Sequence, residues 1–125
     1  MKWEKAVDIQ RHVGVLIGQL QLKHIDKDQV FCFRSFGSKS RAMARIWALP
    51  RIWQMALNSK PGYCLEVISE RYDRLSYDNQ KKVLIHELLH IPKNFSGSLL
   101  SHRSLGGKKF SRNVEDLWLK LKNTK

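Results

Sequence analysis

The segment between Ser76 and Pro92 constrains the fold most, because it has the pattern of a helix that is buried on most of its sides. Ser76 is suited to cap a helix N-terminus, and Asp78 places negative charge in the first turn. Pro92 ends the pattern, so we expect a helix over residues 77–91. Apolar side chains surround most of its circumference, namely Val83, Leu84, Ile85, Leu88, Leu89 and Ile91. The segment therefore predicts a central helix in the core of the protein.

Two histidines lie four residues apart on this helix, as His86 and His90 of an H-E-x-x-H motif. Four residues turn about 400° and rise about 6 Å, so both imidazoles leave the same face, one turn apart. Such a pair can hold one zinc ion, with Glu87 beside it as the acid and base that serves a metal-activated water. The alternative is two core histidines with a glutamate on the helix edge. That arrangement costs burial energy without a compensating partner, and we favour the metal site.

A catalytic zinc site needs a third protein ligand and one open position. His102 follows His90 across a loop that contains Pro92 and Gly97, so the chain can fold back to the metal. Glu115, in a predicted C-terminal helix, is the competing ligand, and we favour His102. Weaker candidates, and histidines for which a surface or packing role is expected, are Asp116, Glu66, His12 and His24.

The rest of the chain predicts an α+β architecture. Apolar periodicity over residues 3–22 predicts an amphipathic helix, and residues 114–121 predict a short C-terminal one. The expected strands are 30–36, 42–49 and 63–68, and a further short helix is expected over 51–57. We expect one domain over residues 1–125, in which a short, mainly antiparallel or mixed sheet packs on helices around the central one.

Basic residues dominate the charge, since 23 Lys and Arg against 11 Asp and Glu give a net charge of +12. Such an excess attracts polyanions, so an association with DNA or RNA is open, although a charge spread along the whole chain is also typical of solvated surface. No apolar run approaches the roughly 18 residues of a membrane span, and no signal peptide is recognisable. We therefore expect a cytoplasmic protein that does not associate with a membrane.

The cysteines and tryptophans are expected in the core. Cys32 and Cys64 lie in apolar, strand-like segments without metal-binding spacing, so they are expected as buried free thiols. The tryptophans do not alternate with Lys or Arg as they would in a base-stacking surface. Core packing is therefore expected for all four, Trp3, Trp47, Trp53 and Trp118.

The segment HELLHIPKNFSG, residues 86–97, with His102 beyond it, resembles the motif of a metallopeptidase family found in phages and archaea. The segments LPRIW (49–53) and LEVIS (65–69) are similar to strand and turn segments of that family. The similarity covers about residues 28–105, most of the chain. The architecture is also similar to that of SprT-like proteases, in which a helix and a small sheet precede the metal helix.

The resemblance implies a zincin-like fold and a zinc-dependent metallopeptidase that acts on a protein or peptide. It also implies that His86, His90 and His102 are the ligands and that Glu87 is the catalytic acid and base. By analogy with zincins, the strand over 63–68 lies near the cleft and could pair with an extended peptide, and a plain core strand fits equally well. Two other functions stay open. One is a basic nucleic-acid-associated protein with a structural or vestigial zinc, including a protease that acts on DNA-bound proteins; the other is a metal hydrolase that cleaves a different bond.

Overall fold

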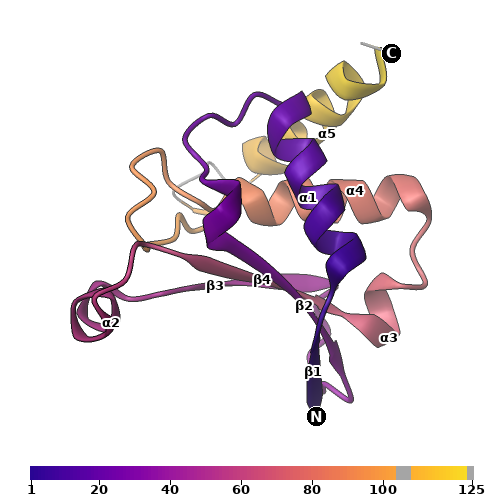
Figure 1. The fold of residues 1–125 in the computed structure, drawn as a ribbon. Coiled ribbons are helices and arrows are strands. Elements are labelled where there is room, and N and C mark those ends of the chain that lie inside the picture. Colours follow the sequence, from indigo (N-terminus) through magenta and orange to yellow (C-terminus); the bar gives the residue numbers. More distant parts are fainter. Residues whose placement is uncertain (104–107, 124–125) are drawn as a thin grey trace.

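The computed structural model describes residues 1–103 and 108–123, and strands and helices are interspersed along the chain (Figure 1). The strands are β1 (Lys2–Lys5), β2 (Val30–Phe36), β3 (Ala44–Ala48) and β4 (Tyr63–Ile68). The helices are α1 (Val7–Gln19), α2 (Arg51–Leu57), α3 (Ser69–Tyr72), α4 (Tyr77–Leu88) and α5 (Lys108–Asn123), with a 3₁₀ turn at Lys27–Gln29. This is the α+β class that the sequence predicts. None of the described helices combines the length and the apolar character that crossing a bilayer requires.

The four strands form one mixed sheet in the order β1-β2-β4-β3. β1 pairs antiparallel with β2, β2 pairs parallel with β4, and β3 pairs antiparallel with β4. β4 is therefore an inner strand, and β1 and β3 are the edges of the sheet. The suggestion that strand 63–68 pairs with a peptide is wrong, because β2 and β3 already bind both of its sides.

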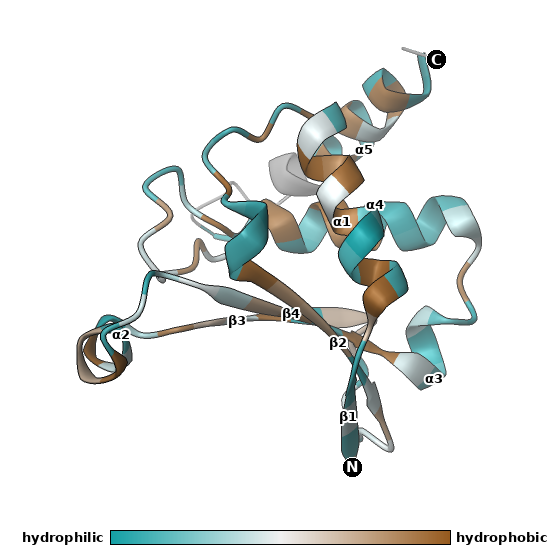
Figure 2. Cartoon of the chain, in the orientation of Figure 1, coloured by the Kyte–Doolittle hydropathy of each residue, from teal (hydrophilic) through white to brown (hydrophobic). Residues whose placement is uncertain are grey.

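One face of the sheet is covered by α1 and α4 and forms the core, and α5 packs against α4 (Figure 1). Leu65 and Val67, alternate residues of β4, point into this layer and are fully buried. α1 carries both apolar and polar residues, and the apolar residues of α4 lie mainly in its C-terminal half (Figure 2). The buried apolar residues of the three helices are Ile9, Val13, Leu16, Ile17, Leu84, Ile85, Leu88, Val114, Trp118 and Leu121. Among the described elements, none lies across the opposite face of the sheet (Figure 1).

The N-terminal region differs from the helix predicted over residues 3–22. Lys2–Lys5 forms β1, and the helix runs only from Val7 to Gln19. The edge of β2 hydrogen-bonds the backbone of the first residues, in a register that places Trp3 opposite Ser35. Helical periodicity cannot reveal such a pairing, because its partner lies some thirty residues further along the chain.

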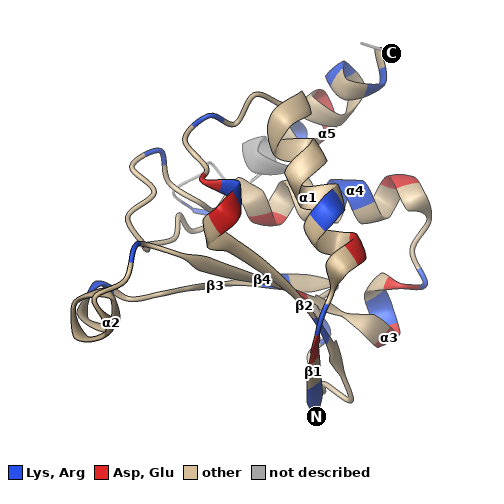
Figure 3. Cartoon of the chain, in the orientation of Figure 1, with Lys and Arg blue, Asp and Glu red and all other residues tan. Residues whose placement is uncertain are grey.

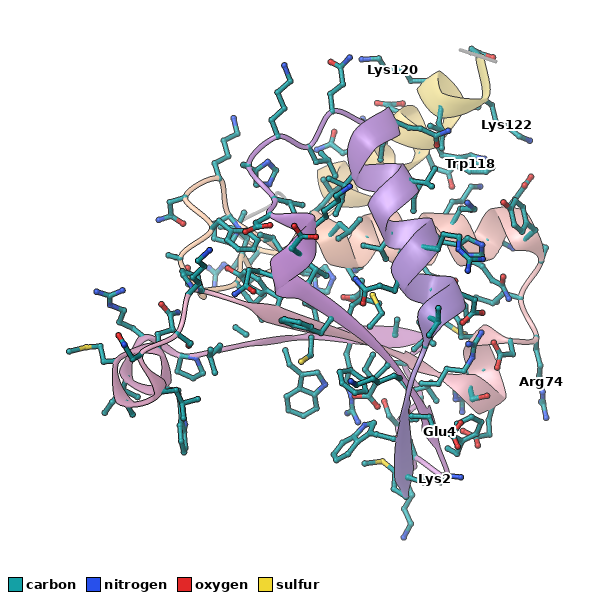
Figure 4. The ribbon with its side chains drawn as sticks, viewed as in Figure 1. Lys2, Glu4, Arg74, Trp118, Lys120 and Lys122 are labelled. Carbon is teal, nitrogen blue, oxygen red and sulfur yellow. The ribbon has the colours of Figure 1, made fainter. Side chains whose placement is uncertain are left out.

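Three of the four tryptophans lie outside the core. Trp3, Trp47 and Trp53 are 55%, 48% and 55% exposed, whereas Trp118 on α5 (labelled in Figure 4) is buried at 7%. The prediction of core packing is confirmed for Trp118 and wrong for the other three. Trp3 and Trp47 belong to strands whose second face has no covering layer, and Trp53 lies on the outer side of α2. The cysteines are both free thiols; Cys32 is buried and Cys64 is half-buried.

Candidate metal centre

The histidine motif lies at the C-terminal end of α4. The helix ends at Leu88, before the predicted end at residue 91. The chain continues in a tighter turn, in which the N–H of His90 donates to the carbonyl of Glu87, three residues back. His86 thus lies on the helix and His90 on the turn. Their ring centroids are 5.3 Å apart, so the tighter turn keeps the two imidazoles next to each other.

The loop over residues 92–102 returns the chain to α4, and side chains from other elements hold it in place. Gln54, the buried residue of α2, donates from Nε2 to the carbonyl of Ser96 at 2.9 Å. The buried hydroxyl of Tyr63 on β4 donates to the carbonyl of Ser98 at 2.8 Å. The loop is therefore fixed to the end of the sheet and to α2.

Gly97 lies against Gln54 of α2. Its φ of +93° is a conformation that residues with a side chain rarely adopt. A Cβ at this position would overlap Nε2 of Gln54 and would lie 2.5 Å from the carbonyl oxygen of Leu49. The N–H of Gly97 also donates to the Tyr63 hydroxyl at 2.9 Å. Glycine is therefore required for the path that leads the chain toward His102.

Three imidazoles converge where the loop meets α4. His86, His90 and His102 each contribute a ring nitrogen that lies within 4.8 Å of the other two. Nε2 of His86 is 2.8 Å from Nε2 of His102, and the ring centroids of His90 and His102 are 4.6 Å apart. Nδ1 of His90 is bonded to the carbonyl of Leu100, which can only accept, so the proton of the neutral ring is on Nδ1 and the lone pair is on Nε2. The group has the composition and spacing to hold a metal ion.

The surroundings of His86 favour its uncharged form. Burial lowers its pKa, and the neighbouring His90 and His102 lower it further, to about 4. The ring is therefore neutral near pH 7, and a metal binds imidazole in this state.

Glu87 is a buried carboxyl group next to this cluster. Only 8% of the residue is exposed, and burial raises the pKa of its carboxyl to about 7. The charged form is disfavoured because the carboxylate loses hydration on burial. Glu87 also lines the same cleft as His86 and His102, so it faces the space in which a substrate would lie.

The cleft has a volume of about 560 Å³ and lies between β3, α4 and α5. Its walls are mostly apolar, with the polar groups gathered at the histidines and at an ion pair. In that pair Nζ of Lys82 lies 3.1 Å from a carboxylate oxygen of Glu115. The lining residues are Ala42, Met43, Ala44, Leu75, Asn79, Lys82, Val83, His86, Glu87, His102, Val114 and Glu115.

The structure brings some of the predicted site residues together and separates others. His86, His90 and His102 form the cluster, and Glu87 is adjacent to it. Glu115 lines the cleft, but within the described residues it is outside the three-histidine group and is paired with a lysine. The remaining candidates lie elsewhere: Asp116 is exposed on α5, His12 packs against Tyr77, His24 follows α1, and Glu66 lies on the open face of the sheet.

Sequence reasoning missed the residues that hold the loop. Gln54 is flanked by exposed apolar neighbours in the sequence, and nothing in that pattern marks it as buried. Tyr63 begins a strand, and its bond to the loop spans 35 residues. The sequence places Gly97 in a loop, but the need for glycine there comes from the contact with α2.

Comparison with known proteins places this geometry in a family. Residues 1–122 match the model of the family described as "Putative phage metallopeptidase". No curated protein and no solved structure matches the chain. The family match extends beyond the resemblance over residues 28–105 and includes β1, α1 and most of α5. With its whole sheet and the histidine cluster inside the matched region, the chain belongs to this phage metallopeptidase family.

Proposed function

We propose that the protein is a zinc-dependent metallopeptidase in which His86, His90 and His102 hold the metal and Glu87 is the general acid and base. The observation that supports this most is the convergence of three imidazole nitrogens beside a buried carboxyl group in an open cleft. Family membership supports the same class of reaction. The α+β architecture is that of a small zincin-like domain.

The donor set suits zinc. Three imidazoles leave one of the four tetrahedral positions open, as a catalytic site requires. The pKa of His86 keeps its ring neutral, and the Leu100 carbonyl orients the ring of His90 so that Nε2 is the donor atom. When bound, zinc supplies Lewis acidity that activates a water and polarises a substrate carbonyl.

Glu87 is positioned to move protons. Its place beside His86 and at the cleft lets it accept the proton of the attacking water and then deliver it to the leaving amine. Burial keeps the pKa of the carboxyl near 7, where a group can both accept and donate a proton at neutral pH. No other acidic side chain among the described residues has both this burial and this position.

The substrate we propose is an extended peptide that lies along β3. This strand is an edge of the sheet, and its N-terminal residue Ala44, with Ala42 and Met43 before it, lines the cleft. An edge strand offers unpaired backbone groups to an incoming peptide. The mostly apolar, open cleft favours contacts with backbone and small side chains over a deep specificity pocket.

The first test is the metal content of the untagged protein, measured by plasma mass spectrometry. Wild-type protein is expected to contain about one zinc per chain, since three histidines make a complete site for a catalytic ion. His102→Ala is expected to lose most of it. Glu115→Ala is the matched control, because this residue lines the same cleft without belonging to the cluster, and it should retain the metal.

Two results would contradict the proposal. One is a wild-type protein that neither copurifies with a transition metal nor takes one up on dialysis against zinc. The other is a metal content that His102→Ala leaves unchanged and Glu115→Ala removes. Cleavage of a fluorogenic peptide pool, abolished by a chelator and restored by zinc, then tests the peptidase assignment.

A further inference from the structure

The open face of the sheet, opposite the helices, presents aromatic side chains in register. Phe31 on β2 and Trp47 on β3 are both paired with Cys64 of β4, so the three form one row across the sheet. In the next row Phe33 lies beside Glu66, and Trp3 on β1 belongs to the row beyond. Rows are about 7 Å apart, because residues on one face of a strand alternate. Figure 4 shows side chains projecting from this face with no helix across it.

These rings are accessible. Trp3, Phe31 and Trp47 are 55%, 45% and 48% exposed. Trp3, Phe33 and Trp47 also surround a hollow of about 350 Å³ that has Glu66 in its wall and is almost entirely apolar. Arg45 lies over one face of the Trp47 ring, and ring faces that remain open on a sheet are suited to stacking on flat, apolar partners.

The exposed charge on this face is positive. Lys5 is exposed and lies opposite Phe33 in the β1–β2 register. The guanidinium of Arg45 lies 5.2 Å from the centroid of the Trp47 ring, and part of its side chain is accessible. Glu66 is the one carboxylate that the four strands place on this face. It is 1% exposed and already paired with Arg45.

Glu4, Asp8 and Asp73 lie on the other face of the sheet. Glu4 is paired in register with Arg34, which points toward the helices and binds Asp8 and Asp73. Arginines and lysines are spread over the rest of the chain, which has a net charge of +12 (Figure 3). A polyanion with flat apolar groups is therefore the partner that complements both the charge and the rings.

We propose that this open sheet face binds single-stranded nucleic acid, with bases stacked on Trp47, Phe31 and Trp3 and the phosphates near Lys5 and Arg45. A four-stranded sheet with exposed aromatic rings on one face is a known geometry for single-strand recognition. Duplex bases are stacked on one another and offer no free ring face, so the face selects single strands. The histidine cluster lies among the helix-side elements, and the binding does not depend on it.

The experiment measures fluorescence anisotropy with a labelled oligothymidylate of about 20 nucleotides, which is long enough for several stacked bases. Phe31→Ala and Trp47→Ala are each expected to weaken binding between about 5- and 150-fold, the range for one lost stacking contact. Trp47→Phe keeps a stacking ring and should retain most of the affinity. Tyr77→Ala, which removes a 60% exposed aromatic ring from α4, is the matched control and should bind as wild type does.

Two further measurements distinguish base stacking on the rings from electrostatic attraction of the oligonucleotide. Addition of unlabelled oligothymidylate should quench tryptophan fluorescence in wild type, and less in Trp47→Phe. A duplex of equal length should compete more weakly than the single strand. Phe31→Ala removes no hydrogen bond that the structure describes, so circular dichroism should show the wild-type fold, which keeps the test valid if Trp47→Ala destabilises the protein.

The proposal is overturned if no binding occurs at low salt, or if the aromatic variants bind as tightly as wild type with the same salt dependence. The second result would mean that the net charge alone attracts the polyanion. It is also overturned if sedimentation shows a wild-type dimer that Phe31→Ala converts to a monomer, because the face would then be an interface between copies. His102→Ala should bind the oligonucleotide normally, so failure of the zinc proposal would leave this one standing.

Discussion

Glu87 on α4 and Glu66 on β4 are both buried glutamates, but their surroundings shift their acidity in opposite directions. Burial raises the pKa of Glu87 to about 7, and no described group offsets it. Burial would also raise the pKa of Glu66, but hydrogen bonds from Arg45 and Trp47, at 2.9 and 2.8 Å, contribute to lowering it to about 2. A buried carboxylate whose charge is stabilised by hydrogen bonds stabilises a fold. A buried carboxyl group that lacks such partners and lies beside a cleft is suited to proton transfer.

The largest expected effect is the loss of peptide cleavage when Glu87 is replaced. Glu87→Gln removes the proton acceptor but keeps the shape of the side chain, so peptide cleavage should fall by about 10²- to 10⁴-fold. Zinc content should not change, because the three histidines remain, and thermal unfolding should not begin earlier. Loss of zinc or of stability together with activity would show that Glu87 is structural. The two glutamates, Glu87 and Glu66, would then have the same role.

The matching change on the other side is Glu66→Gln, which should act on stability. The shift of the Glu66 pKa from about 4.5 to about 2 corresponds to roughly 3 kcal/mol at neutral pH, and the variant should lose free energy of unfolding of that order. Urea titration at pH 7 measures the loss. Cleavage per folded molecule and zinc content should stay at wild-type values, since this carboxylate is on the opposite face of the sheet from the cleft.

Lowering the pH should reduce the difference in free energy of unfolding between wild type and Glu66→Gln. The folded-state pKa of Glu66 lies below the unfolded one, so its contribution is complete above about pH 4.5 and is lost as pH falls toward 2. The gap of roughly 3 kcal/mol at pH 7 should narrow to about half at pH 3. Other acidic groups titrate equally in both proteins and cancel in the difference. If the difference in free energy of unfolding between the two proteins stays constant with pH, the Glu66 carboxylate is not held in its charged form.

Local signals in the sequence predicted most of the fold. Strands β2 and β4 and helix α2 have the predicted bounds, and Ser76 caps α4 by accepting a hydrogen bond from the N–H of Asn79 at 3.2 Å. Two of the errors, at β1 and β4, came from contacts between distant segments. β1 forms because β2 offers an edge, and β4 is an inner strand because β3 returns to its other side. That residues 1–125 form one domain stays a prediction.

The residues of the candidate site also fall into two groups, those found from local spacing and those that depend on contacts between distant segments. The spacing of His86, Glu87 and His90 is local, and the sequence was sufficient to find it. Among the described residues His102 lies with His86 and His90 and Glu115 does not, and the choice of His102 as third ligand stays a prediction. The side chains that route the loop come from α2 and β4, and no spacing within the motif could have identified them. The pairing of Glu66 with Arg45 and Trp47 was equally hidden, because it crosses two strands.

The smallest expected effect on stability comes from removing one hydrogen bond to Glu66. Trp47→Phe keeps an aromatic ring on the open face but removes the indole N–H that donates to the Glu66 carboxylate at 2.8 Å. Arg45 remains bonded to the carboxylate, so the loss should be limited to about 1.5 kcal/mol, the low end for a hydrogen bond to a charged acceptor. Trp53→Phe is the matched control, since this indole makes no hydrogen bond that the structure describes, and it should leave stability unchanged. Equal effects of the two substitutions in urea titrations would show that loss of ring area, and not the bond to Glu66, sets the stability. The low pKa of Glu66 would then depend on Arg45, Ser35 and Trp3 more than on Trp47.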